Sequence, residues 1–202
     1  MSRVARHLLL AVLIVSLASC GGERQFTADD VETIVPSAAD APVNTTLRVD
    51  TSGSKTLEQF IEATEVRDKL KGLGFKVAYV ATFATPAFPA DPLKAPLGAA
   101  LYSSFAVVLR DSKAAEQGFA FYQKRSKRRA TDPTPVLTTG FGEDAVAFHF
   151  TRLENTALPG IAYLWRVGNV LLSVVGVGVP GPEAAATRTL ALTMNRRATA
   201  KG

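Results

Sequence analysis

The sequence is poor in the side chains that metal sites use most. It contains one cysteine, Cys20, and two histidines, His7 and His149. A disulfide within the chain needs two cysteines, and a structural zinc site needs several Cys or His ligands. The sequence therefore excludes a fold held by internal disulfides and a multi-histidine metal centre. We expect no metal and no cofactor.

Common catalytic motifs are also missing. The phosphate-binding pattern G-x-x-x-x-G-K-[ST] does not occur, and no G-x-S-x-G elbow is present. Glu143, Asp144 and Glu154 are the carboxylates that a hydrolase could use, but any chain with 18 acidic residues offers such a set. His149 lies in "AVAFHFTR", where strand alternation points it away from the two phenylalanines beside it. We therefore predict that the protein is not an enzyme.

No apolar run is long enough to cross a membrane. Leu8–Leu17 is an almost uninterrupted apolar run of ten residues and follows Arg3 and Arg6. A membrane-spanning helix needs about 20 residues, whereas a signal peptide has an apolar core of about 7 to 15. The run therefore has the length and the flanking charges of a signal peptide.

The residues that follow this run are Leu17-Ala18-Ser19-Cys20. They resemble the lipobox of bacterial lipoproteins, in which the cysteine is acylated and the preceding segment is removed. The resemblance implies that 1–19 is a signal peptide and that Cys20 is the lipid attachment point, for example for palmitate. It also implies export, with the protein anchored to the outer face of the cell membrane or to an outer membrane.

The charge is mild. The net charge is +5, and removal of Arg3 and Arg6 with the signal peptide leaves +3 (5 minus 2). This is too weak to indicate nucleic acid as a partner, which export also disfavours. The apolar content of 47% is ordinary for a globular domain. We divide the chain into the signal peptide 1–19, the lipidated Cys and an extended tether over 20–54, and a single domain over 55–200.

The hydrophobic pattern of this domain predicts an α+β fold with the order α-β-β-α-β-β-β-α. Thr56 and Gln59 form a capping box that begins the first helix. Gly168-Asn169 separates two apolar runs and indicates a hairpin. We expect a mainly antiparallel sheet of about five strands with three covering helices, and the last strand in its centre. The expected strands are 75–83, 99–109, 145–152, 161–167 and 170–179, and the later helices are 113–126 and 183–197.

A cluster of basic residues ends the second helix: Lys124, Arg125, Lys127, Arg128 and Arg129. Two interpretations remain open. The cluster could face anionic lipid headgroups or an acidic wall polymer. It could equally be a solvated helix end, whose cations suit the helix dipole.

Aromatic side chains gather on the predicted strands and on a proline-rich loop over 84–98. If helices cover the sheet closely, these side chains are core; if a gap remains, they line a pocket for an apolar ligand. The long loop could then act as a lid. The candidates for ligand contact are Phe83, Phe88, Tyr102 and Trp165.

The last third of the sequence resembles a known group of exported domains. "GFGEDAV" (140–146) precedes a strand, and "YLWRVGNVLLSVVGVG" (163–178) contains an Arg-x-Gly-Asn hairpin, followed by an Ala-rich helix. This stretch, 140–198, is similar to actinobacterial cell-wall lipoproteins and to the extracellular sensor domains of some receptor Ser/Thr kinases. The resemblance implies an antiparallel sheet with helices, and a domain that binds ligands rather than catalyses.

These observations lead to one preferred function and one alternative. The first is a lipid-anchored cell-envelope protein with a soluble, non-catalytic domain that binds an apolar small molecule, an envelope glycan or an envelope protein. The alternative is a structural or assembly factor that works through protein contacts. The two differ in what they require: the first needs an enclosed apolar pocket, the second a filled core and an exposed apolar patch.

Overall fold

The computed structural model describes residues 24–142, 144–154, 156–179 and 184–200. The predicted signal peptide, Cys20 and Glu143 lie outside the described residues.

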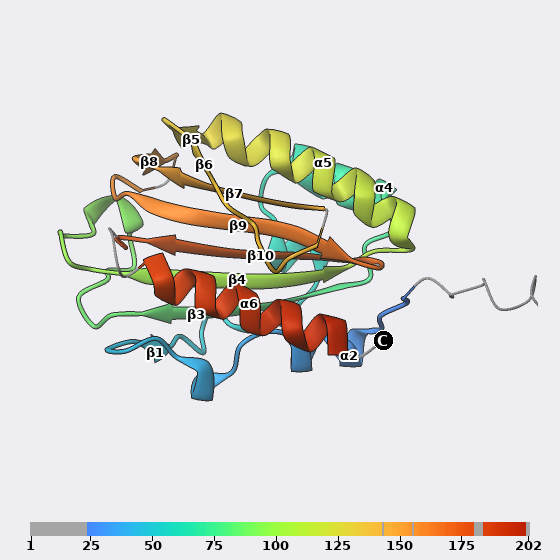
Figure 1. Cartoon of the computed structure of the whole chain (residues 1–202), viewed down its shortest axis with the longest axis horizontal. Helices are drawn as coiled ribbons and strands as arrows, with labels where there is room; N and C mark the ends of the chain where they lie inside the picture. Colours follow the sequence, from blue (N-terminus) through green and yellow to red (C-terminus); the bar gives the residue numbers. More distant parts are fainter. Residues whose placement is uncertain (1–23, 143, 155, 180–183, 201–202) are drawn as a thin grey trace, which may run out of the picture.

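An antiparallel sheet of eight strands forms the middle of the molecule (Figure 1). Its order is β1-β3-β4-β10-β9-β7-β6, with β2 also paired to β3. The predicted α+β class is confirmed, and β10 is central as expected, because its side chains are apolar on both faces. The strands are β1 (Thr46–Leu47), β2 (Gly53–Lys55), β3 (Val77–Ala84), β4 (Leu101–Val108), β6 (Thr134–Val136), β7 (Ala145–Phe150), β9 (Gly160–Val167) and β10 (Val170–Val177).

The five predicted strands correspond to β3, β4, β7, β9 and β10, which are the longest strands of the sheet. The number five was too low, because β1, β2 and β6 add two or three residues each at the edges. Such short segments carry too few side chains to show alternation. A separate two-stranded sheet joins β5 (Ala130–Thr131) to β8 (Arg152–Leu153).

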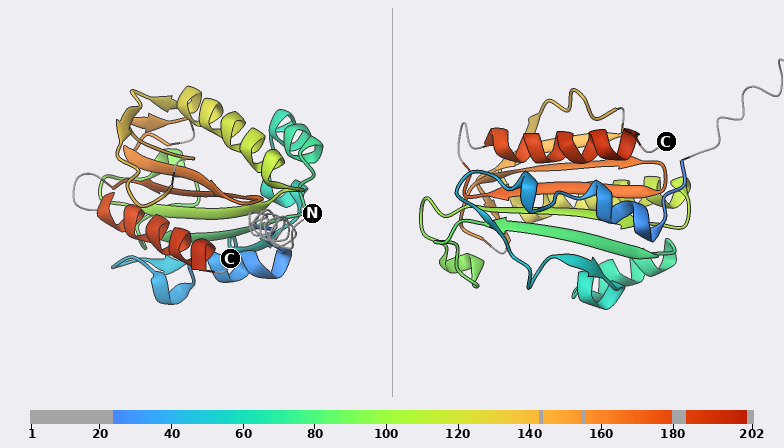
Figure 2. Two further views of the ribbon diagram at one scale, coloured as in Figure 1. Left: turned by 45° about the vertical axis from the view of Figure 1, so that its right-hand side comes forward. Right: turned by 90° about the horizontal axis from the view of Figure 1, so that it is seen from below.

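Helices cover both faces of the sheet (Figure 2). The helix predicted from Thr56 is divided in two, although its capping box is present. On one face α2 and α6 enclose a core around β10, and on the other α4 and α5 enclose a second core. The helices are α2 (Ala28–Ile34), α3 (Leu57–Phe60), α4 (Thr64–Gly72), α5 (Ser112–Arg129) and α6 (Ala184–Ala200), with 3-10 turns η1 (Ala38–Asp40) and η2 (Pro92–Lys94).

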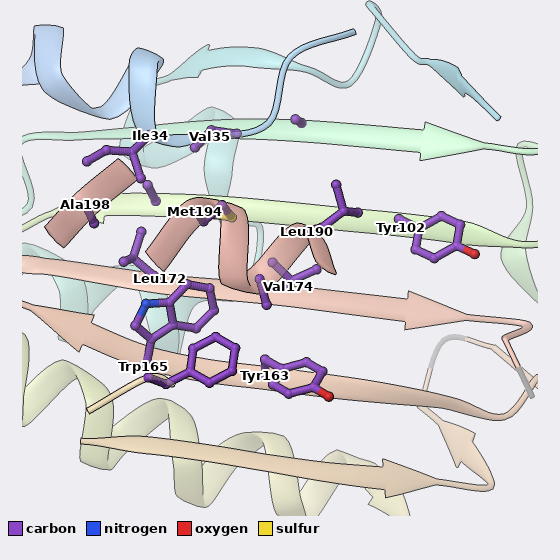
Figure 3. Close-up of a cluster of buried hydrophobic side chains, with 14 of the residues drawn as sticks. Ile34, Val35, Tyr102, Tyr163, Trp165, Leu172, Val174, Leu190, Met194 and Ala198 are labelled. Atoms are coloured by element: carbon purple, nitrogen blue, oxygen red, sulfur yellow. The ribbon is translucent and has the colours of Figure 1, made fainter. Parts of the chain in front are cut away.

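The core beneath α6 is closed and rich in large side chains (Figure 3). Trp165 and Leu172 are neighbours on β9 and β10, and both are fully buried. Met194 from α6 lies over them. The Phe141 ring meets Trp165 edge to face, with 5.1 Å between ring centres. On this face of the sheet, aromatic and aliphatic side chains are closely packed and buried.

The N-terminal part of the described chain is packed against this core. Phe26, Val31 and Ile34 are buried, and α2 contacts both α6 and the sheet. The sequence led us to expect a loose extended segment over 20–54, with a short helix in it at most. The folded body instead begins at Phe26, well before the predicted boundary at residue 55. We call residues 24–35 the N-terminal strap.

Asn169 holds the N-terminal strap in place. Its side-chain oxygen accepts a hydrogen bond from the Phe26 N–H at 2.6 Å, and its amide nitrogen donates to the Phe26 carbonyl at 3.1 Å. The same nitrogen donates to the Leu109 carbonyl at 3.0 Å. The amide of this fully buried side chain thus pairs with the strap as a neighbouring strand would. The hairpin at Gly168-Asn169 is confirmed, but only Gly168 has a positive φ.

A second set of hydrogen bonds joins the end of α6 to the last residue of the strap and to Asp40 after it. Arg197 donates two hydrogen bonds to Asp40, at 2.8 and 3.0 Å, and one to the Val35 carbonyl. Burial of Asp40 opposes its ionisation. The Ser37 N–H and the Arg197 guanidinium outweigh this effect and hold the pKa of Asp40 below its ordinary value.

Because of the Asp40–Arg197 pair, we expect the protein to lose stability in acid. The Asp40→Asn variant should lack this pH-dependent loss. Because the folded pKa is lowered, the stabilisation is present above the unfolded pKa of about 3.9 and is lost as the pH falls through the folded value. At pH 7 we expect Asp40→Asn to cost on the order of 1 to 2 kcal/mol in urea unfolding. The difference from wild type should shrink toward zero in acid. Asp50→Asn, at an exposed residue, is the matched control. It should change neither the unfolding free energy at pH 7 nor its loss in acid.

Candidate functional site

A cavity of about 310 Å³ lies between the second half of α5 and the sheet. Four neighbouring strands supply its floor, each through the residues of one face. Most of the floor is apolar, with two serines in the middle. The lining residues are Leu101, Ser103 and Phe105 of β4, Ser173, Val175 and Val177 of β10, Ala162 and Leu164 of β9, Phe148 of β7, Leu153 of β8, and Tyr122, Arg125, Ser126 and Arg129 of α5.

The residue pattern of α5 explains why a cavity forms there. In its first half the side facing the sheet carries the small residues Ala114, Ala115 and Gly118, which are buried. A Cβ at Gly118 would come within 3.0 Å of Leu109, so the helix packs closely at this point. The second half turns a stripe of larger, polar residues to the sheet, spaced i, i+3, i+4 and i+7 from Tyr122. Arginine and serine do not fill apolar space, and the cavity results.

Tyr122 is a buried polar side chain of the cavity lining. It is 9% exposed, and its hydroxyl has no hydrogen-bond partner within the described structure. Burial raises the pKa of this hydroxyl well above its usual value, although the nearby Arg125 opposes the shift. The group therefore stays protonated at neutral pH and can donate a hydrogen bond. A buried hydroxyl without a partner is unfavourable, and a ligand acceptor would relieve the cost.

Two arginines stand at the edge of the cavity, each held by a carboxylate outside it. Arg125 lies 3.3 Å from Glu65 of α4, and Arg129 pairs with Glu154 after β8. Both carboxylates are largely exposed, at 64% and 65% of the side chain. The described lining of the cavity itself contains both arginines and no acidic residue. The edge of the cavity therefore presents two guanidinium groups, each paired with a carboxylate that lies outside the cavity.

A second hollow, of about 760 Å³, adjoins this site and shares Tyr122, Arg125 and Arg129 with it. Phe60 and Ile61 supply its apolar part. The Phe60 ring also packs on Phe105 of the first cavity, with 5.3 Å between ring centres. The two hollows form one amphipathic region under the end of α5.

The structure divides the predicted basic cluster into two groups. Arg125, which is half-buried, and Arg129, which is exposed, line the cavity, whereas the exposed residues Lys124, Lys127 and Arg128 lie outside its lining. Neither interpretation from the sequence described this arrangement. The signal was present in the spacing of Tyr122, Arg125, Ser126 and Arg129, which places all four on one side of a helix.

The four aromatic residues named as candidate ligand contacts lie elsewhere. Phe83, Tyr102 and Trp165 belong to the closed core beneath α6, on the opposite face of the sheet. Phe88, from the proline-rich loop, is buried in a third cluster together with Phe148, Ala162 and Val177, which line the cavity. None of the four is itself a lining residue. Their role as ligand contacts stays an untested prediction.

The remaining candidates for chemistry do not converge among the described residues. Asp144 pairs with Arg166, Glu154 pairs with Arg129, and His149 is exposed on β7. No group of three or more His, Cys, Asp or Glu side chains in the described ranges is placed to hold a metal ion. In the same ranges, no helix combines the length and hydrophobicity that a transmembrane segment requires.

The GFGED turn has a structural role. Gly140 and Gly142 have positive φ, which lets the chain turn sharply on either side of Phe141. Phe141 then enters the core, and Asn195 donates a hydrogen bond to the Gly140 carbonyl at 2.7 Å. The turn therefore fixes α6 to the sheet.

Comparison with known proteins gives a likeness of fold. No family model matches the chain, and no curated protein matches it. Among solved structures, it is similar to the extracellular domain of PknH from Mycobacterium tuberculosis, with a TM-score of 0.55 and 10% identity. The likeness covers 89% of this chain and 100% of that domain. The resemblance to exported sensor domains is thus confirmed as a shared fold, over far more of the chain than residues 140–198.

Proposed function

We propose that this protein is exported, anchored to the cell envelope through an acylated Cys20, and binds a small ligand without transforming it. The ligand site is the cavity between α5 and the sheet. The observation that carries the proposal is a cavity of about 310 Å³ with a mostly apolar floor, lined by Tyr122, whose buried hydroxyl has no hydrogen-bond partner among the described residues. Ligand sites in proteins have this composition: apolar walls with a few fixed polar groups.

The position of the strap supports an anchor at Cys20. Arg24, at the start of the strap, lies beside the turn between β9 and β10, since a Cβ at Gly168 would come within 2.2 Å of the Arg24 carbonyl. The cavity extends toward the opposite end of these strands, where β10 ends at Val177 and β4 begins at Leu101. An anchor four residues before Arg24 would hold the turn nearest the membrane and leave the cavity accessible. The likeness to an extracellular domain agrees with export.

The proposal predicts that filling the cavity abolishes ligand retention and leaves the fold intact. Native mass spectrometry of the Cys20→Ser chain, purified without detergent and mixed with envelope extracts, should show one added mass. Ala162→Phe, from the floor, should remove this mass, as should Ser126→Trp, from the helix. Because the ring enters space that is already empty, we expect a loss of stability of no more than about 1 to 3 kcal/mol, the range for small-to-large substitutions.

The control is Ala120→Trp, at an exposed position of the same helix, which should keep the added mass. Retention of the ligand by folded Ala162→Phe and Ser126→Trp would place the site elsewhere. A wild-type chain that never gains mass from any extract would overturn the proposal and favour the assembly factor.

A further inference from the structure

We infer that the ligand is an anionic amphiphile: an apolar chain with a carboxylate or phosphate head. The inference rests on the proposed function and names the chemical class of its ligand. The chain would lie on the floor of the cavity, and the head would bind Arg125, Arg129 and Tyr122.

The floor provides for the apolar part. Phe105, Leu164 and Val175 come from three adjacent strands and line the cavity, and Phe105 also packs on the Tyr122 ring of α5, with 6.0 Å between ring centres. Such a surface is costly when it faces water and favours an apolar occupant, at about 25 cal/mol per Å² covered. A fully polar ligand, such as a free sugar, would find few partners there, because the Ser173 hydroxyl already donates to the Tyr163 carbonyl at 2.9 Å.

The edge provides for the head. Guanidinium groups bind carboxylates and phosphates through paired hydrogen bonds. Arg125 and Arg129 are one helical turn apart and both line the cavity, so one anionic group can reach both. The protonated Tyr122 hydroxyl lies one turn before Arg125 and supplies a third donor. A cavity whose described lining has three such donors and no acid selects against cations.

Glu65 and Glu154 occupy the arginines from outside in the ligand-free protein. An exposed ion pair of this kind contributes little, about 0 to 1 kcal/mol, so an anion in the cavity can displace or share it. The two glutamates therefore act as weak competitors that also keep the arginines in position. Removing the charge of the two glutamates should therefore strengthen anion binding.

The test compares three probes of equal chain length on the delipidated Cys20→Ser chain: dodecanoate, dodecyl phosphate and dodecan-1-ol, by isothermal titration calorimetry. We expect at least one anion to bind tenfold or more tightly than the alcohol. Arg125→Gln and Arg129→Gln should each weaken anion binding about tenfold and leave the alcohol unchanged. Tyr122→Phe should weaken anion binding several-fold. Glu65→Gln with Glu154→Gln should strengthen it several-fold.

Matched controls are Arg196→Gln on α6 and Glu116→Gln on α5, both exposed and outside the lining. The tighter of the two anions assigns the head as carboxylate or phosphate. Equal binding of alcohol and anions, with no effect of the arginine variants, would overturn the anionic class and leave a neutral apolar ligand in the same cavity. No binding of any probe would also overturn the class; the proposed function would then fail only if envelope extracts add no mass either.

Discussion

Replacing Asn169 with alanine should cost about 3 to 5 kcal/mol of unfolding free energy, although the residue lies in a two-residue turn. The substitution removes three buried hydrogen bonds at once. It leaves the N–H and the carbonyl of Phe26 without the partner that replaces water. A hydrogen-bond donor or acceptor stranded in this way costs about 1 to 3 kcal/mol.

The effect should begin in the strap. Urea unfolding gives the total loss, and amide hydrogen exchange should rise first at Val31–Ile34, because these residues follow Phe26 in the strap. Asn169→Asp should be worse than alanine at pH 7, since it buries a charge beside a carbonyl that needs a donor. Asn195→Ala, which loses one hydrogen bond, to Gly140, should cost about a third as much. A loss below 1 kcal/mol for Asn169→Ala would show that the strap does not depend on this amide.

Asn169 also illustrates what a sequence can and cannot predict. The turn itself was predictable, because Gly168-Asn169 separates two apolar runs and Gly168 has the required positive φ. The role of the asparagine was not, since its partners are the backbone of Phe26 and Leu109, 143 and 60 residues away. A hydrogen bond to a backbone group leaves no pattern in the sequence, because nearly every residue has the same backbone groups. A short helix such as α2, with Val31 and Ile34 as its buried residues, shows too little periodicity to indicate docking.

The long strands could be predicted because the pattern of apolar and polar residues in each strand reflects which of its faces is buried. β10 is apolar on both faces and lies in the centre, and β7 alternates buried Phe148 and Phe150 with exposed His149. The cavity depends instead on the distance between α5 and the sheet. That distance follows from Gly118 at one contact point and from the residues on facing strands, so it emerges only when the layers are assembled.

The aromatic candidates show the same limit. A sheet has two faces, and the sequence indicated that aromatic residues line them without saying which face is closed. Phe83, Tyr102 and Trp165 lie under α6, where the core is filled. The face under α5 retains empty space, and its lining combines the aromatic residues Phe105, Tyr122 and Phe148 with aliphatic residues and with polar ones such as Ser103.

Trp165 should therefore prove to be a core residue. Trp165→Ala should cost about 3 to 5 kcal/mol, the range for large aromatic residues removed from a packed interior. The side chain is fully buried, meets the Phe141 ring edge to face and lies beside Leu172 and Met194 (Figure 3). We expect the cavity left by the indole to stay largely unfilled, because it lies between the sheet and α6.

Trp165→Phe should be much milder, at about 1.5 kcal/mol or less, and it separates packing from ligand binding. The indole N–H has no hydrogen-bond partner among the described residues, so phenylalanine loses volume but no polar contact. Since Trp165 lies on the face opposite the cavity, the stable Phe variant should retain its ligand with unchanged affinity. Urea unfolding and calorimetry on the same samples measure both effects. A Trp165→Phe protein that folds normally and loses its ligand would contradict the placement of the site under α5.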